Sequence, residues 1–347
     1  MRRDELLNKL KYVKSTNLYQ FFQEIIYSSV IKFISRLYRD DIDDNFIILS
    51  TYGGKAFIDN TKYLFLYLNK IRKYKTAIIT SSEELSNELN SKGYKVIPKF
   101  SLRSIRILRR AKFIFTTHGI FDVLPIDFSP NTTFVCTWHG VQNKRNKTVH
   151  GPIKYFKLAR YCKLKTVNED YMDYFVTTSG TEKDIKLIMN YFLISRNKIL
   201  TTGYPRNDIL FNDDRAFKAL LRNKYQIAEN VNTIILYAPT FRDKVFTAKF
   251  PLSKSQLVKL NTILKQTNSI LIMKAHMFEK FINFKEYTHI KKAPQNADIQ
   301  ELLNLTNTLI TDYSSVYCDF LLLDRPILFF TYDFEDFIRL LKTLNII

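Results

Sequence analysis

Short apolar segments alternate with longer helix-like stretches through most of the 347 residues. The apolar segments are rich in Ile, Val, Phe and Thr, and several are apolar on both faces, as buried parallel strands are. Such alternation favours parallel sheets with helices on both faces. The predicted strands form two series, the first at 46–50, 77–80, 95–98, 113–116, 133–137, 174–178 and 198–202, and the second at 233–238, 269–274, 308–311 and 327–330.

Two series of strands predict two domains. The stretch 209–232 carries the polar run Asp213-Asp214-Arg215 and no predicted strand, so we place the domain boundary near it. The expected fold class is α/β, with two Rossmann-like domains, 1–210 and 211–347, facing across a cleft. Ligands of open α/β sheets bind at the C-terminal ends of the strands, so functional residues are expected in the turns there.

The charge balance limits the kinds of partner. The chain carries 53 Lys and Arg against 33 Asp and Glu, a net charge of +20. This favours nucleic acid, an anionic membrane or phosphorylated substrates, although part of the lysine excess also fits an AT-rich coding sequence. The basic residues are dispersed and form no RNA or DNA motif, which argues against nucleic acid.

The cysteines and the N-terminal region bear on the compartment. Cys136, Cys162 and Cys318 are far apart, so we expect neither a disulfide framework nor a zinc site, and a reducing compartment fits best. Neither a secretory signal nor about 18 uninterrupted apolar residues is present. The stretch 18–38 has the pattern of an amphipathic helix with a basic edge. Such a helix can lie on an anionic membrane or pack on its own domain.

The segment 309–319 predicts a strand that turns directly into a helix. Thr311, Asp312 and Tyr313 form the turn, and the helix begins near Ser314 and Ser315. Hydroxyls at a helix start cap the free N–H groups, and the same N–H groups can also seat a phosphate. An ordinary capped helix and a phosphate site both remain open from this segment alone.

Two further turns follow strands of the first series. In Trp138-His139-Gly140 the histidine can take a proton from an attacking hydroxyl, and the glycine lets the backbone approach a ligand. The turn 201–208 displays Arg206 and Asp208. The alternatives are a structural histidine in the first turn and a structural turn with an Arg–Asp pair in the second.

Two turns follow strands of the second series. After Pro239 come Thr240 and Arg242, and the planar fork of an arginine suits a phosphate. Lys274 and His276 stand together after the next strand, where the histidine can neutralise a phosphate or protonate a leaving oxygen. A surface arginine and a structural histidine are the alternatives.

The order of these turns resembles that of a known family. WHG at 138–140, GYPRND at 203–208, YAPTFRD at 237–243, KAH at 274–276 and ITDYSSVYCDFLLLDRPILFFTYD at 310–333 are together similar to the CDP-glycerol glycerophosphotransferases. These are the teichoic-acid polymerases and primases and their capsule-synthesis relatives. The resemblance covers about 52–333. It implies a two-domain GT-B fold and transfer of glycerol phosphate from CDP-glycerol to a hydroxyl on a lipid-linked acceptor, with release of CMP.

The resemblance also implies roles for single residues. His139 would be the base that activates the acceptor hydroxyl, and His276 would act at the donor phosphates. Asp312 would order its turn, since a carboxylate repels the anion. The donor would be held by Thr240, Arg242, Ser314 and Ser315, while Gly140, Arg206 and Asp208 would line the turns at the cleft. No carboxylate cluster suits Mg²⁺, so neither a metal nor a cofactor is expected.

The expected partners follow from the same resemblance. They are CDP-glycerol or CDP-ribitol, an undecaprenyl-linked polyol-phosphate or glycan acceptor, and the anionic cytoplasmic face of the plasma membrane, where the protein would be peripheral. A nucleotide-sugar GT-B transferase is an alternative. The chain stops at Ile347, which looks short for the family, so a truncated, non-catalytic binding paralogue is another. The acceptor, the polymer and assembly into a homo-oligomer are left open.

Overall fold

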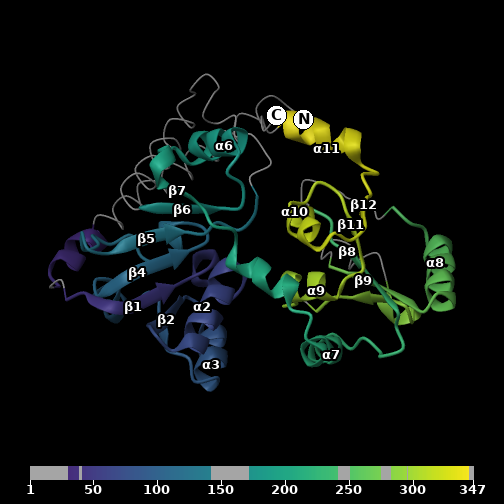
Figure 1. Ribbon diagram of the computed structural model, residues 1–347, viewed down its shortest axis with the longest axis horizontal. Coiled ribbons are helices and arrows are strands. Elements are labelled where there is room, and N and C mark those ends of the chain that lie inside the picture. Colours follow the sequence, from purple (N-terminus) through teal and green to yellow (C-terminus); the bar gives the residue numbers. More distant parts are fainter. Residues whose placement is uncertain are drawn as a thin grey trace, which may run out of the picture. The chain divides into compact units, whose positions relative to one another are not determined.

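The computed structural model describes residues 30–38, 41–141, 172–240, 251–274, 283–294 and 296–343. These residues divide into two compact units. The first unit extends to His139 and includes 172–176 and 194–200, and the second holds the other described residues. Each unit is built around one parallel sheet (Figure 1).

The first sheet has seven strands in the order β3-β2-β1-β4-β5-β6-β7 within the described residues. They are β1 Asp43–Leu49, β2 Lys75–Thr80, β3 Val96–Pro98, β4 Ala111–Thr116, β5 Thr133–Cys136, β6 Tyr174–Thr177 and β7 Ile199–Thr201. The helices α2 Asp59–Ile71, α3 Glu83–Ser91, α4 Leu102–Leu108 and α6 Glu182–Phe192 stand between strands along the chain. Strands β1 and β4 therefore end beside each other at the same edge, and β5 follows next to β4.

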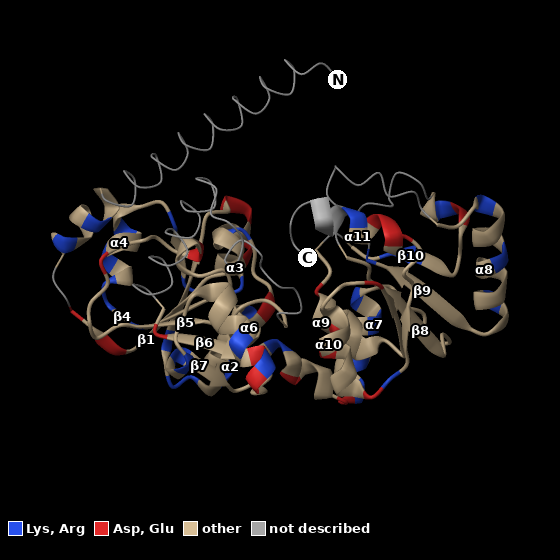
Figure 2. Ribbon diagram, turned by 90° about the horizontal axis from the view of Figure 1, so that it is seen from above, with Lys and Arg blue, Asp and Glu red and all other residues tan. Residues whose placement is uncertain are grey.

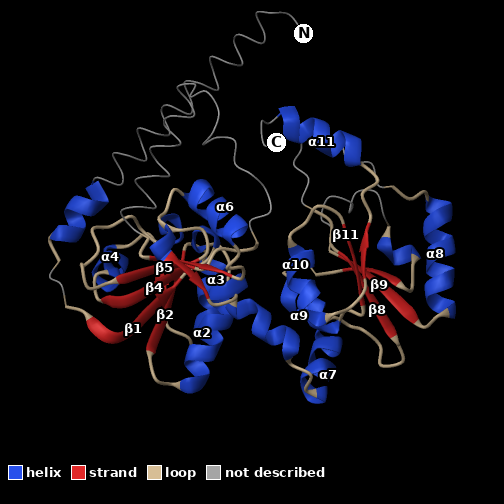
Figure 3. Ribbon diagram, turned by 45° about the horizontal axis from the view of Figure 1, so that its top comes forward, coloured by secondary structure: helices blue, strands red, loops and turns tan. Residues whose placement is uncertain are grey.

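Both faces of this sheet are buried, which is why its strands read as apolar at successive positions. Ile48 packs with Ile105 and Leu108 from α4 on one face. On the other face, Ile47 and Leu49 belong to a cluster that includes Phe65 and Leu68 from α2 and Leu89 from α3. Helices on both sides of the strands are visible in Figure 3.

The second sheet has five strands in the order β10-β9-β8-β11-β12 within the described residues. They are β8 Thr233–Tyr237, β9 Ser269–Met273, β10 Ile290–Lys292, β11 Thr308–Thr311 and β12 Ile327–Phe329. The helices of this unit are α7 Arg215–Lys224, α8 Lys254–Gln266, α9 Ile299–Leu305, α10 Val316–Phe320 and α11 Phe334–Thr343. Alternate residues of β8 again serve two faces: Ile234 and Leu236 join the cluster with α9, and Tyr237 joins the cluster with α8.

The predicted fold class, α/β with two Rossmann-like sheets, is confirmed. Each of the eleven predicted strands overlaps an observed strand, and the stretch 209–232 contains no strand. Strand β10 was not predicted, because two of its three residues are lysines and it lies at the edge of the sheet, where no apolar run is needed.

The described part of the predicted amphipathic stretch is helical at residues 30–36. Ile31, Ile34 and Tyr38 pack against the core of the first unit, while Phe33 and Leu37 are exposed. The part before residue 30 lies outside the described residues. None of the helices that the structure describes has both the length and the apolar composition that crossing a membrane requires.

Candidate active site

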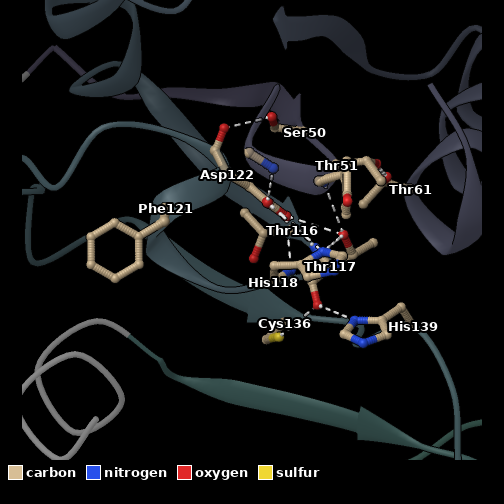
Figure 4. Close-up of polar contacts among 12 residues, drawn as sticks. Ser50, Thr51, Thr61, Thr116, Thr117, His118, Phe121, Asp122, Cys136 and His139 are labelled. Carbon is tan, nitrogen blue, oxygen red and sulfur yellow. Dashed lines mark hydrogen bonds and ion pairs between the residues drawn. The ribbon is translucent and has the colours of Figure 1, made fainter. Parts of the chain in front are cut away.

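Three loops of the first unit meet at the C-terminal ends of β1, β4 and β5 (Figure 4). They are the 3-10 turn Tyr52–Gly54 after β1, residues 117–122 after β4, and residues 137–139 after β5. Because β4 pairs with both β1 and β5, these loops share one edge of the sheet. The predicted catalytic residue His139 therefore lies where ligands of open α/β sheets bind.

The ring of His139 is oriented by the backbone of the neighbouring loop. Its Nδ1 lies 3.5 Å from the carbonyl oxygen of Thr117, a long hydrogen bond. A carbonyl oxygen only accepts, so a hydrogen bond here places a proton on Nδ1, and in the neutral ring the lone pair is then on Nε2. Trp138 covers the same ring at a centroid distance of 3.9 Å. A half-buried imidazole in this tautomer can accept a proton.

The carboxylate of Asp122 holds two of the three loops together. It is fully buried and accepts the backbone N–H groups of Thr117 at 2.7 Å, His118 at 2.8 Å and Gly53 at 2.6 Å. Lys99 reinforces the junction, since its Nζ donates to the carbonyl oxygens of Gly53 at 3.0 Å and Phe121 at 2.5 Å. Burial of this ammonium group lowers the pKa of Lys99.

His118 is a histidine of this site that the sequence reasoning missed. Its ring is stacked on the ring of His139, with a centroid distance of 4.1 Å and an angle of 13° between the planes. A signal was present, because His118 follows the predicted strand 113–116 as closely as His139 follows 133–137. Asp122 gave no such signal, since it lies further along the same loop.

In the second unit, Gly140 lies against the start of α10. Its carbonyl oxygen accepts a hydrogen bond of 2.8 Å from the Tyr204 hydroxyl. A Cβ atom on Gly140 would come within 3.0 Å of the Ser315 Oγ, closer than ordinary contact. Ser315 is the N-cap residue of α10, but its side chain makes no capping hydrogen bond. Ser314 Oγ accepts only a long bond of 3.5 Å from the Val316 N–H, so capping by these hydroxyls is weak.

Arg206 belongs to a buried polar network of the second unit. Its Nη2 pairs with Asp319 Oδ2 at 2.8 Å, and both side chains are almost fully buried. Asp319 also accepts from Asn207 Nδ2 at 3.2 Å and from Gln300 Nε2 at 2.9 Å. The partner of Arg206 is thus Asp319 of the segment 309–319, while Asp208 is exposed. Asp319 was missed because a carboxylate inside a helix pattern gives no sign of a distant partner.

The turn after β11 is tied to the end of β8. Asp312 Oδ1 accepts from the backbone N–H and the hydroxyl of Thr240, both at 2.7 Å. The carboxylate therefore orders this turn through contacts with its own protein. Lys274, at the end of β9, donates from Nζ to the Ala297 carbonyl at 2.6 Å, and burial lowers the pKa of this lysine. Two other predicted site residues, Arg242 and His276, lie outside the described residues.

The predicted residues that the structure describes thus lie in three groups, one in the first unit and two in the second. His139 stands with Trp138 and His118 in the first unit. Within the second unit, Gly140 and Ser315 form one group with Arg206 close by, and Thr240 and Asp312 form another.

Comparisons with known proteins agree on one family. The model of the CDP-Glycerol:Poly(glycerophosphate) glycerophosphotransferase family matches residues 32–343. The teichoic acid poly(glycerol phosphate) polymerase of Bacillus spizizenii is 32% identical over 89% of this chain and 79% of that protein. The teichoic acid ribitol-phosphate polymerase TarK of Staphylococcus aureus is 26% identical over 67% of this chain, which spans 45% of that protein.

A solved structure shares the fold. The wall teichoic acid polymerase TagF superposes with a TM-score of 0.73 at 24% identity, over 97% of this chain and 81% of that chain. A variant of TagF was also solved after soaking with CDPG.

Proposed function

Since the chain belongs to the CDP-glycerol:poly(glycerophosphate) glycerophosphotransferase family, whose matched members include teichoic acid polymerases, we propose that it transfers glycerol phosphate from CDP-glycerol to a hydroxyl of a lipid-linked cell-wall or capsular acceptor and releases CMP. The observation that carries this proposal is the orientation of His139. Its Nδ1 faces the Thr117 carbonyl oxygen, so Nε2 is the atom that can take a proton.

In the proposed reaction the acceptor oxygen attacks the phosphorus of the glycerol phosphate group. The new P–O bond forms as the bond to the CMP phosphate breaks, and the acceptor proton moves to Nε2 of His139. Phosphoryl transfer depends mainly on positioning and on stabilising the charge of the phosphate oxygens. Our candidates for holding the donor are Ser314, Ser315, Thr240, Arg242 and His276. Asp312 would order the turn that carries the two serines.

CDP-ribitol is a second candidate donor. The family resemblance of this chain extends to a ribitol-phosphate polymerase, although the glycerol-phosphate polymerase of Bacillus spizizenii is more similar. Both donors share the CDP half and differ in the polyol. The choice between them is therefore decided by assay with each donor.

We also propose that the protein is peripheral at the anionic cytoplasmic face of the membrane, where an undecaprenyl-linked acceptor would lie. Val30, Phe33 and Leu37 follow one another at helical spacing and are at least half exposed. Lys32 and Arg36 lie on the same helix. Apolar side chains flanked by basic ones are typical of helices that lie in a membrane surface.

The first test is CMP release from CDP-glycerol with a membrane fraction as acceptor. We expect wild type to release CMP and His139→Gln to be about 10²–10⁴-fold slower, the range for losing a general base. His289→Gln is the matched control, because the Nδ1 atom of this half-buried histidine also contacts a threonine oxygen, the Thr288 hydroxyl, but His289 lies in the second unit. Equal rates for wild type and His139→Gln would remove His139 from the mechanism. CDP-ribitol and UDP-sugars in place of CDP-glycerol identify the donor.

A further inference from the structure

His118 contacts His139 face to face rather than through a hydrogen bond. The ring centroids are 4.1 Å apart and the planes differ by 13°. Trp138 contacts His139 as well, at 3.9 Å and a tilt of 34°, and also lies 6.1 Å from the His118 ring. The His139 ring thus contacts two aromatic neighbours, of which His118 is the parallel one.

His118 is itself fixed by a chain of hydrogen bonds to Asp122. The Thr117 hydroxyl lies 3.1 Å from Asp122 Oδ2 and 2.7 Å from His118 Nδ1. A carboxylate only accepts, so the hydroxyl donates its single proton to Asp122 and accepts from the Nδ1–H of His118. The Asp122 carboxylate is fully buried and accepts hydrogen bonds from three backbone N–H groups, so it holds the Thr117 hydroxyl, and through it His118, in a fixed position.

A single residue, Thr117, therefore contacts both rings. The Thr117 hydroxyl receives Nδ1–H of His118, and the Thr117 carbonyl oxygen faces Nδ1 of His139. Among the described residues, other titratable groups near the pair include Cys136, whose buried Sγ donates to the same Thr117 carbonyl oxygen at 3.7 Å, and Tyr52, which packs edge-on against His118 at 5.3 Å. The ammonium group of Lys99 is held by Gly53 and Phe121. None of these contacts replaces the parallel stack.

We propose that His118 is a positioning residue for the phosphotransfer reaction: its ring, held by Thr117 and Asp122, fixes the plane of His139 so that Nε2 points at the acceptor hydroxyl. This rests on the proposed role of His139 as the base. A small misplacement of a reacting group can cost about 10²-fold in rate, so a fixed ring plane has a measurable effect.

Two substitutions distinguish the effect of the His118 ring from the effect of its hydrogen bond to Thr117. His118→Phe keeps a flat ring but loses the contact with Thr117, whereas His118→Asn keeps a polar group near Thr117 and loses the ring. We expect His118→Asn to lower kcat for CMP release about 10–100-fold with KM for CDP-glycerol within about 2-fold of wild type. His118→Phe should keep clearly more of kcat than His118→Asn. An active Asn variant beside an inactive Phe variant would overturn the proposal.

A spectroscopic readout tests the inference independently of activity. With five histidines in the chain, the imidazole ¹H–¹⁵N signals of His139 can be assigned from their absence in His139→Gln. We expect the Nδ1–H tautomer in wild type, with ring signals that shift in His118→Asn, remain near wild type in His118→Phe and do not change in the control His289→Asn. Unchanged His139 signals in His118→Asn would refute the stack. If those signals respond but wild type releases no CMP, the positioning holds and the proposed function fails.

Discussion

Arg206 and Asp319 show how a single buried pair joins two motifs of the chain. Arg206 lies in the turn 203–208, and Asp319 lies on α10, directly after the turn that holds Ser314 and Ser315. Asn207 and Gln300 complete the hydrogen bonds of the carboxylate. A buried ion pair of this kind contributes little beyond what an apolar pair of the same shape would, but losing one partner leaves a buried charge. The pair thus links α10 to the turn 203–208.

Removal of one partner is expected to be far more harmful than removal of both. We predict that Asp319→Ala lowers the free energy of unfolding of the second unit by about 3–5 kcal/mol, and that Arg206→Met/Asp319→Leu recovers most of this loss. Urea unfolding of both variants and wild type measures it. Asp208→Ala, an exposed carboxylate of the same motif, is the control and should stay within about 0.5 kcal/mol. A double variant as unstable as Asp319→Ala would contradict the interpretation.

At the scale of an element, the glycine of Trp138-His139-Gly140 matters for the space it leaves. Gly140 packs where a Cβ atom would meet the Ser315 hydroxyl oxygen at 3.0 Å, at the first turn of α10. The next nearest atom, Ser315 Cβ, would be 3.8 Å away, an ordinary contact. The glycine and the serine therefore constrain each other through one oxygen atom.

This close approach gives a prediction about two substitutions. Gly140→Ala should destabilise the second unit by about 1–3 kcal/mol, because the added methyl group comes too close to the Ser315 hydroxyl oxygen. The same change in the background of Ser315→Ala should cost less than half as much, since the oxygen is gone. Thermal or urea unfolding of wild type, the two single variants and the double variant gives the coupling energy between Gly140→Ala and Ser315→Ala. Gly180→Ala is the control, as its Cβ would meet Thr201 at 3.4 Å. Equal costs in both backgrounds would exclude the Ser315 contact as the cause.

The elements could be predicted from the sequence to the extent that burial leaves a pattern. Strands such as β8 and β11 are covered on both faces, so their apolar runs mark them within one residue. The edge strand β10 has no such run. Turn residues could be found by their position after strands, but partners could not: Asp319 lies 112 residues from Asn207, and no local rule indicates that they meet. His118 was recoverable from position alone, and its stacking on His139 was not.

For the whole molecule, the net charge of +20 and the exposed stripe formed by Val30, Phe33 and Leu37 together lead to one prediction. Basic residues are spread over both units in Figure 2, so charge alone would not single out the helix at residues 30–36 for an anionic surface. Only insertion of apolar side chains would select a particular face. Phe33 and Leu37, at 65% and 71% exposure, are the side chains that we expect to insert.

We therefore predict that Phe33→Asp/Leu37→Asp lowers binding to phosphatidylglycerol vesicles at least about 10-fold, since burying one large apolar side chain contributes about 1.5–3 kcal/mol. Vesicle sedimentation measures the bound fraction. Leu220→Asp, at an equally exposed leucine on α7, is the control and changes the charge without touching the stripe. High salt should weaken the remaining binding of the double variant more than that of wild type, because only charge then holds it. Equal binding of the double variant and Leu220→Asp would mean that attraction is electrostatic and selects no face.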